Sequence, residues 1–237
     1  MNNRFFADRN DFFKYDLLLE VLEKSGFLVQ LTFITMLTPD DGRTGGGLTE
    51  YPCGARRADL YEFLMGCLTS NRRNIQELRR FFRNCSFEYT PYRDSQFFED
   101  RARDEYFRNI PNSALQSALV FLDPDNGLEV LSTNSKNADK YVTFKDLRGL
   151  LDRIDDQSVL SVFQYLPRQN RDRYIQRMAS SLRNGILAEH MIFVSDNRIL
   201  IMFLGKNIEN VKNLNHELES YSNQHGLLLV SYGMGTN

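Results

Sequence analysis

The sequence predicts an α/β protein with a mostly parallel sheet between helices, folded as one domain over residues 1–237. Strand-like and helix-like segments alternate along most of the chain, which is typical of parallel strands joined by right-handed helical crossovers. Two late strand-like segments are separated only by Asp196-Asn197, a turn dipeptide that predicts an antiparallel hairpin. No linker-like stretch divides the chain. We therefore expect a three-layer domain with an antiparallel hairpin near the C-terminal end.

Periodicity identifies the elements of the first half of the chain. Apolar residues at helical spacing predict a helix over residues 12–24, which Gly26 ends. Residues 28–37 are rich in β-branched and aromatic side chains and predict the first strand. Further expected elements are helices at 59–68 and 71–83, a short strand at 87–90 ended by Pro91, and a charged helix at 95–109 ended by Pro111.

The second half continues the alternation. An apolar run at residues 119–122 predicts a buried strand, and it is followed by a polar loop. The remaining expected helices are 143–154, 171–184 and 208–224, and the remaining strands are 158–166, 190–195, 198–204 and 227–232. The hairpin at 190–204 is expected to add an antiparallel edge to the sheet.

Composition restricts the class of protein. Hydrophobic residues make up 42% of the chain and charged residues 25%, which is ordinary for a soluble globular protein. No apolar run approaches the 18 residues of a membrane span, and the first residues lack the layout of a signal peptide. Cys53, Cys67 and Cys85 form no CxxC pair, so we expect reduced cysteines rather than disulfides or a zinc site. These features favour a cytoplasmic protein without a membrane partner; the oligomeric state stays open.

The most informative segment follows the buried strand at 119–122. It reads Asp123-Pro124-Asp125-Asn126-Gly127, with Glu129 two residues later. All five residues are of types common in turns, so a plain turn is one interpretation. A functional site is the other, because ligands of open α/β sheets bind at the carboxyl ends of the strands. Asp123 directly continues a buried strand and needs a partner, and Glu129 adds an acid that a turn does not require. We favour the site.

Acids at a neighbouring strand end suggest a metal. Asp40 and Asp41 follow the first strand, and they are expected to meet Asp123 and Asp125 if the two strands are adjacent. Carboxylates that converge in a cleft suit Mg²⁺ or Mn²⁺, with Glu129 as a further ligand. Such a cation activates water and neutralises the negative charge of a phosphoryl group. Arginine and lysine side chains also bind phosphoryl groups. The candidates for that second role are Arg168 and Lys140. The sequence thus predicts a metal-dependent enzyme, most plausibly a phosphodiester hydrolase acting on nucleic acid or nucleotides.

Residues 72–108 combine many arginines with many aromatic residues. This composition is expected of a surface that follows phosphates and stacks bases, so nucleic acid is a predicted partner. The alternative is a pair of amphipathic helices that bury the aromatic residues and expose the arginines. Acidic residues in the same segment offset much of its charge, and the net charge of the chain is −2. The second interpretation is therefore favoured about two to one.

The element order resembles the Rossmann-like fold of S-adenosylmethionine-dependent methyltransferases, which also finish with a helix and an antiparallel strand pair. Residues 123–126 resemble the Asp-Pro-Pro-Tyr motif of amino-group nucleic-acid methyltransferases. Asp123 and Pro124 match, whereas Asp125 and Asn126 replace the second proline and the aromatic residue. The resemblance implies that Asp123 grips the target amino group. It also implies a Gly-x-Gly cofactor loop after the first strand, where this chain has Thr38-Pro39-Asp40-Asp41-Gly42 and reaches Gly45-Gly46-Gly47 several residues late.

The chain as a whole resembles a poorly characterised bacterial and phage family. The matching segments are Phe13-Lys14-Tyr15, Phe121 to Glu129, Lys140-Tyr141-Val142 and Gln164-Tyr165-Leu166-Pro167-Arg168. Relatives often carry His at the position of Tyr165, and the resemblance implies no established activity. A non-catalytic interaction module of phage or defence origin is therefore a further alternative. A PD-(D/E)xK nuclease motif fails because Leu131 stands in the lysine position, and the triple glycine is not a P-loop because no Lys-Ser/Thr follows it.

Overall fold

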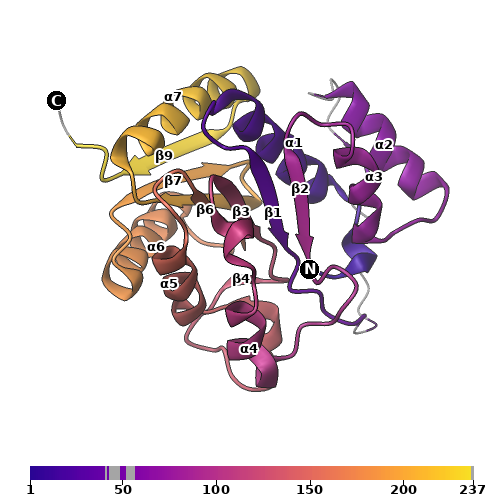
Figure 1. The fold of residues 1–237 in the computed structure, drawn as a ribbon, viewed down its shortest axis with the longest axis horizontal. Coiled ribbons are helices and arrows are strands. Elements are labelled where there is room, and N and C mark those ends of the chain that lie inside the picture. Colours follow the sequence, from indigo (N-terminus) through magenta and orange to yellow (C-terminus); the bar gives the residue numbers. More distant parts are fainter. Residues whose placement is uncertain (41, 43–48, 52–56, 236–237) are drawn as a thin grey trace.

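The computed structural model describes residues 1–40, 42, 49–51 and 57–235. Within these ranges the protein is built around a seven-stranded mixed sheet in the order β2-β1-β3-β6-β8-β7-β9 (Figure 1). The strands are β1 Gln30–Ile34, β2 Glu88–Tyr92, β3 Ala118–Leu122, β6 Val159–Tyr165, β7 His190–Ser195, β8 Ile199–Gly205 and β9 Leu228–Tyr232. The α/β class predicted from the alternation of segments is confirmed.

Five strands of the sheet run in one direction. β2, β1, β3 and β6 pair in parallel, β8 is antiparallel to both β6 and β7, and β9 is antiparallel to β7. The hairpin predicted around Asp196-Asn197 is confirmed as β7 and β8. It does not form the edge of the sheet, because β8 pairs with β6 and β9 lies outside β7. Burial explains the difference: every residue of β8 is buried, whereas those of β9 are half-buried and suit an edge.

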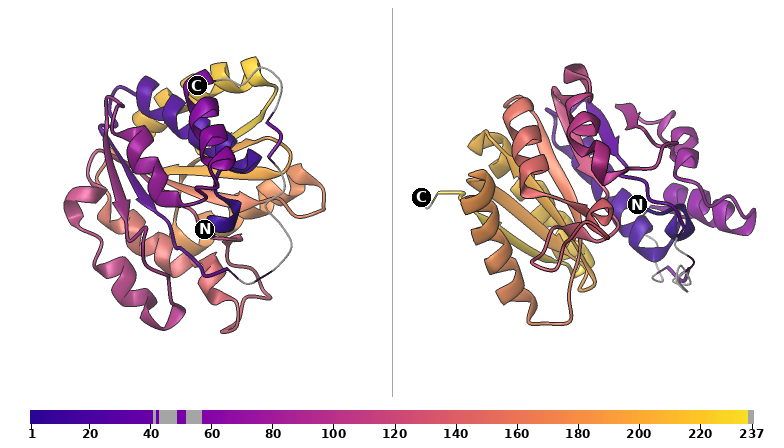
Figure 2. Two further views of the ribbon diagram at one scale, coloured as in Figure 1. Left: turned by 90° about the vertical axis from the view of Figure 1, so that its right-hand side faces the viewer. Right: turned by 90° about the horizontal axis from the view of Figure 1, so that it is seen from below.

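Helices cover both faces of the sheet (Figures 1 and 2). One hydrophobic core joins Phe33 and Phe121 of the sheet to α1 Arg9–Lys24, α2 Ala58–Thr69, α3 Leu78–Phe82 and α7 Ile208–His225. A second core joins Val120 and Leu122 to α4 Arg103–Arg108, α5 Phe144–Arg153 and α6 Arg171–Ile186. Alternate residues of β3 thus face opposite cores, as the two-residue period of a strand requires. The three-layer arrangement follows from this double burial.

Four local predictions differ from the structure. The helix expected over 71–83 is interrupted, with a 3-10 turn at Ile75–Glu77 before α3, and that expected over 95–109 shrinks to the 3-10 turn Asp100–Ala102 and α4. Pro91 lies inside β2 rather than ending it, which an edge strand tolerates because one row of its N–H groups needs no partner. The polar loop after β3 contains a short parallel pair, β4 Gly127–Leu128 and β5 Tyr141–Val142, that periodicity does not reveal.

Candidate functional site

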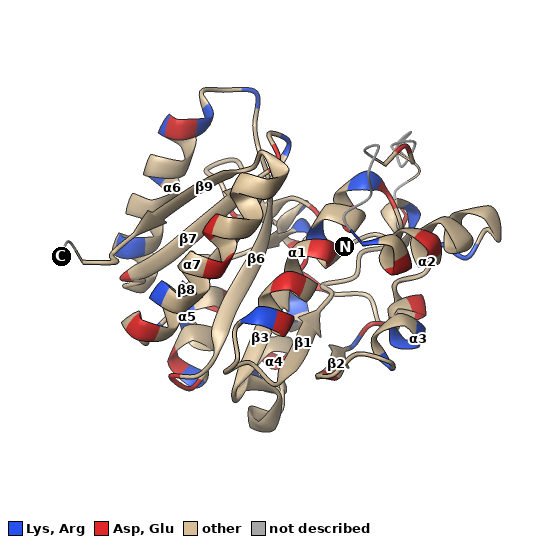
Figure 3. Ribbon diagram, turned by 90° about the horizontal axis from the view of Figure 1, so that it is seen from above, with Lys and Arg blue, Asp and Glu red and all other residues tan. Residues whose placement is uncertain are grey.

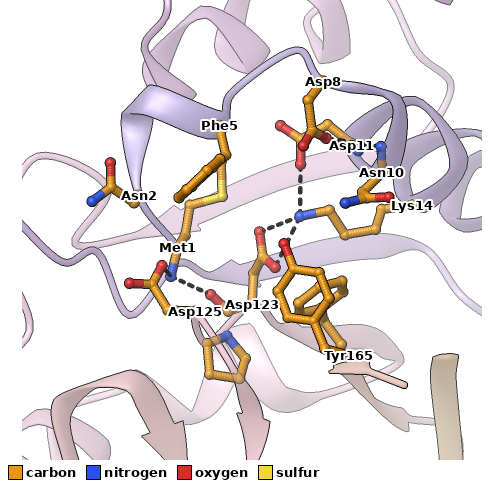
Figure 4. A pocket seen from close by; sticks show the side chains of 12 residues that line it. Met1, Asn2, Phe5, Asp8, Asn10, Asp11, Lys14, Asp123, Asp125 and Tyr165 are labelled. Carbon is orange, nitrogen blue, oxygen red and sulfur yellow. Dashed lines mark hydrogen bonds and ion pairs between the residues drawn. The ribbon is translucent and has the colours of Figure 1, made fainter. Parts of the chain in front are cut away.

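The carboxyl ends of β1, β3 and β6 meet at a small hollow beside the first turns of α1 (Figure 4). The cavity volume of the hollow is about 20 Å³, close to the room that one water molecule needs. Its lining is acidic on one side and aromatic on the other, and consists of Met1, Asn2, Phe5, Asp8, Asn10, Asp11, Lys14, Asp123, Pro124, Asp125, Phe163 and Tyr165. Asp123 comes directly after β3, and its backbone N–H extends the ladder by donating to Ile34. The strand-end motif therefore lies at the sheet edge that the fold class predicts for a ligand site.

The buried partner of Asp123 is Lys14 of α1. The Lys14 ammonium donates to both carboxylate oxygens of Asp123, at 3.0 and 2.8 Å, and lies 2.7 Å from Asp11 Oδ1. Lys14 is 3% exposed and Asp123 1% exposed. Burial opposes the charge of Lys14, but the two carboxylates outweigh it and raise its pKa far above the ordinary value. Lys14 therefore stays an ammonium, which makes it an orienting cation for Asp123 and not a base.

Asp8 and Asp11 add two further buried acids from the start of α1. Asp8 is the N-cap of the helix, and its Oδ1 accepts the backbone N–H groups of Asn10 and Asp11 at 2.8 and 2.9 Å. Asp11 Oδ2 accepts the N–H of Ala7 at 2.9 Å. Desolvation raises the pKa of Asp8 and raises the pKa of Asp11 to about 7, although Lys14 acts in the opposite direction on both. Near neutral pH the Asp11 carboxyl is thus poised to exchange a proton beside the ion pair.

Asp125 closes the opposite wall of the hollow. Its Oδ1 lies 3.1 Å from the Met1 nitrogen, and its Oδ2 accepts a hydrogen bond from the Thr38 hydroxyl. The Met1 nitrogen also donates to the carbonyls of Asp123 and Met36, at 2.7 and 3.1 Å. The loop after β1 and the loop after β3 are thereby joined through side chains and backbone at the base of the hollow.

Tyr165, the last residue of β6, forms the aromatic side of the hollow. The residue is 39% exposed, while its hydroxyl points toward Lys14 and Asp123 (Figure 4). Desolvation, followed by the effect of Asp8, raises its pKa to about 12, so the phenol is neutral at physiological pH. The adjacent Gln164 holds the motif loop: its Oε1 accepts Leu128 N–H at 2.7 Å and its Nε2 donates to Tyr165 O at 2.8 Å. Gly127, at φ 108°, leaves room for this amide.

The structure brings together only part of the predicted metal site. Asp123 and Asp125 line the same hollow. Asp40 is exposed and pairs with Arg4 at 3.0 Å, and Glu129 Oε1 instead accepts the Phe144 N–H at the start of α5. Arg168 is exposed after β6, and Lys140 precedes β5, where its carbonyl accepts Asn126 N–H. Asp41 and the triple glycine lie outside the described residues. Within the described ranges, no group of three or more His, Cys, Asp or Glu residues is arranged to hold a metal ion.

Lys14, Asp8, Asp11 and Tyr165 belong to the site but were not candidates from the strand-end pattern. Asp11 and Lys14 stand three residues apart in a helix whose other residues are largely apolar and aromatic. A charged pair at that spacing, on a helix buried along much of its length, indicates a polar contact inside the protein. The identity of the contact, Asp123, lies 109 residues away and depends on the fold.

The arginine and aromatic residues of 72–108 are largely used within the protein. Phe82, Phe98 and Tyr106 are buried in the two cores. Several arginines pair with acids, as in Arg79–Asp94 and Arg103–Asp146. Figure 3 shows basic and acidic residues interspersed over the helices rather than separated into faces. This arrangement favours the structural interpretation of the segment and gives no support to a nucleic-acid surface there.

Comparisons with known proteins assign neither a family nor a function to the chain. The chain matches no protein-family model, no curated protein and no solved structure. Among the helices of the described residues, none combines the length and the apolar character that crossing a membrane requires.

Proposed function

We propose that the chain is an enzyme that binds a base of a nucleotide or nucleic acid with the exocyclic amino group of that base in the hollow at Asp123. The observation that carries the proposal is the Asp123 carboxylate at the end of a central strand, with both oxygens oriented by Lys14. A carboxylate offers about four lone-pair positions, of which Lys14 uses two. The remaining positions suit the N–H groups of an exocyclic amine. In amino-group methyltransferases, which residues 123–124 resemble, the equivalent acid has this role.

An aromatic residue supports the same proposal. Asn126 stands where the resembled motif has its aromatic residue, which by itself weakens the case for base stacking. Tyr165, from the neighbouring strand β6, lines the hollow and is partly open to solvent. An aromatic face next to hydrogen-bonding groups is the usual way in which proteins hold an unstacked base. Tyr165, on a neighbouring strand, thus supplies the aromatic side chain that the motif lacks.

These residues can accept hydrogen bonds from the amino group of a base and can take up a proton. Asp123 accepts N–H bonds and increases the electron density on the bound nitrogen. Lys14 cannot remove a proton, because it stays charged. Asp11, with a pKa of about 7 and only Lys14 between it and Asp123, is the nearest acid able to take up a proton at neutral pH.

S-adenosylmethionine is the methyl donor that the resemblance implies, and the described residues do not form a cradle for it. No glycine follows β1 directly, and the Thr38 hydroxyl is hydrogen-bonded to Asp125. The hollow, at about 20 Å³, is far smaller than a pocket for a whole cofactor. We therefore assign no step to this cofactor. A rise in melting temperature with millimolar S-adenosylmethionine would show that the chain holds it elsewhere, and no rise would exclude methyl transfer from it.

Metal-dependent phosphodiester hydrolysis, also predicted from the sequence, is less well supported by the geometry. Lys14 takes up both oxygens of Asp123, so a metal ion would have to displace an ammonium from a buried pair. Calorimetry with Mg²⁺ and Mn²⁺ tests this alternative. Binding by the unmodified protein that is lost in Asp123→Ala would favour hydrolysis over amino-group recognition.

Matched nucleosides test the proposed function directly. Cytidine and uridine differ by an amino and a keto group, as do adenosine and inosine. We expect the amino member of at least one pair to bind at least tenfold more tightly in calorimetry, because a keto oxygen facing Asp123 leaves the carboxylate without a donor. Asp123→Asn should remove the preference, and Asp40→Asn, which changes an exposed acid, should leave it unchanged. Equal binding of both members of both pairs would contradict the proposal.

A further inference from the structure

Another cavity lies between α6 and the loop that follows β4. Its volume is about 700 Å³, and it shares no lining residue with the hollow at Asp123. Its apolar lining comes from Leu128 and Val130 of the loop, from Phe144 at the start of α5, and from Tyr174 and Met178 of α6. A cavity of this size, lined mostly by apolar side chains, suits an apolar group that enters from outside.

The same loop presents an apolar side chain at the rim of this cavity. Leu131 lines the cavity and is fully exposed, and its neighbour Val130 is 43% exposed. Both belong to a turn in which Thr133 N–H donates to the Val130 carbonyl at 2.8 Å and Val130 N–H donates to Thr133 Oγ1 at 2.9 Å. Turns of this kind usually carry polar residues, glycine or proline, so an exposed leucine there indicates a contact surface. The hydrogen bonds hold the turn in place, which reduces the entropy lost on binding.

The charges of the lining are complementary to one another but are not paired within the chain. Glu129 and Arg177 both line the cavity. Glu129 Oε1 accepts the backbone N–H of Phe144, and Arg177 Nη2 donates to the side-chain oxygen of Gln169. Among the described residues, neither forms an ion pair. One face thus carries an exposed apolar side chain, an apolar cavity, an acid and a base, which is the self-complementary set that a twofold interface requires.

We propose that two copies of the chain associate through this face. Leu131 of each copy lies in the cavity of the other, and Arg177 of each copy pairs with Glu129 of the other. The twofold axis forms every contact twice, so one exposed leucine and one free arginine are sufficient. The interface also holds the loop after the strand-end motif, whose Leu128 N–H is bound by Gln164. The proposal is independent of the proposed function, because it concerns a different cavity.

Sedimentation equilibrium of the full chain tests the association. We expect a monomer–dimer equilibrium between about 1 and 100 µM, the range in which a small twofold interface dissociates. Leu131→Asp should weaken the dimer at least about tenfold, because it places a carboxylate in each apolar cavity. It should leave the urea midpoint of the monomer unchanged, because Leu131 has no packing to lose. Val29→Asp changes another exposed apolar residue, 60% exposed and outside this cavity, and should dimerise as the unmodified protein does.

A second pair of variants tests the charges. Arg177→Glu should weaken the dimer at least about fivefold, because two carboxylates then face each other across each contact. Arg183→Glu, the same change at an exposed position of α6 outside the cavity lining, should have no effect. A chain that is monomeric at 100 µM would overturn the inference and leave this face to another protein or to a small apolar molecule. A dimer that keeps its affinity in Leu131→Asp would also overturn it, because the copies would then meet elsewhere.

Discussion

The charges around Lys14 and the charges of residues 72–108 are both organised as ion pairs, yet they differ in burial and in balance. Around Lys14, two carboxylates that are at most 2% exposed, those of Asp11 and Asp123, share one ammonium, and the buried Asp8 lines the same hollow. In 72–108 most pairs are open to water, as in Arg101–Glu99, where the two side chains are 85% and 52% exposed. The pair between Arg103 and Asp146, at 9% and 3%, is a buried exception. Surface pairs of this kind contribute little to stability, whereas an unbalanced buried cluster is costly and is retained where it has a use. Density of charge in the sequence is thus a poor guide to a site, and burial is a better one.

The largest expected effect comes from removing the shared cation. Lys14→Met keeps most of the side-chain volume but leaves Asp11 and Asp123 buried without their ammonium. We expect a loss of about 3–5 kcal/mol in the free energy of unfolding, measured by urea denaturation. Lys145→Met removes an equally short pair, with Asp104, between side chains that are 74% and 61% exposed, and it should leave the urea midpoint unchanged.

A second substitution distinguishes charge from packing. If the loss in Lys14→Met arises from unpaired carboxylates, adding Asp123→Asn should recover part of it, because the double variant buries one charge fewer. The opposite result would be a double variant with a lower free energy of unfolding than Lys14→Met. That result would mean that Lys14 stabilises the protein through packing alone.

The next effect is a pH dependence that only the buried cluster should show. The folded protein raises the pKa of Asp11 from 3.8 to about 7, so it holds this proton more tightly than the unfolded chain does. The stability linked to the proton is present below pH 4 and is lost as the pH rises through 7. Asp11→Asn cannot titrate, so its stability relative to the unmodified protein should rise between pH 5 and pH 8 by on the order of 2 kcal/mol. Urea midpoints at four pH values test this; a constant difference would contradict the raised pKa.

The smallest effects belong to residues 72–108. Asp94 is 3% exposed and its partner Arg79 is 51% exposed, at 2.8 Å. Arg79→Ala should therefore cost about 1 kcal/mol or less, because water screens the guanidinium, and 1 M salt should reduce the cost further. Arg101→Ala should leave the unfolding midpoint unchanged. A loss in either variant as large as that in Lys14→Met would remove the contrast between the two regions.

Much of the architecture follows from local pattern in the sequence. The hairpin of β7 and β8 is predictable because two apolar runs flank a two-residue turn, and the position of Asp123 is predictable because an apolar strand stops at an acid. The pairing of Lys14 with Asp123 is not, because it depends on which face of α1 meets the end of β3. Asp40 illustrates the same limit. β1 and β3 are adjacent, which the metal hypothesis required, but Asp40 is exposed and pairs with Arg4.

The position of β8 between β6 and β7 has a consequence for the order of assembly. Until residues 199–205 are available, β6 carries one open edge beside strands that are already buried on both faces. Because β8 comes late in the chain, the folding of the parallel strands β2, β1, β3 and β6 depends on the C-terminal part of the chain. During synthesis the hydrophobic edge of β6 is therefore exposed while more than thirty further residues are added. Chains that stop before β8 should present that edge to one another and aggregate, so the last strands of the sheet act as its internal cover against self-association.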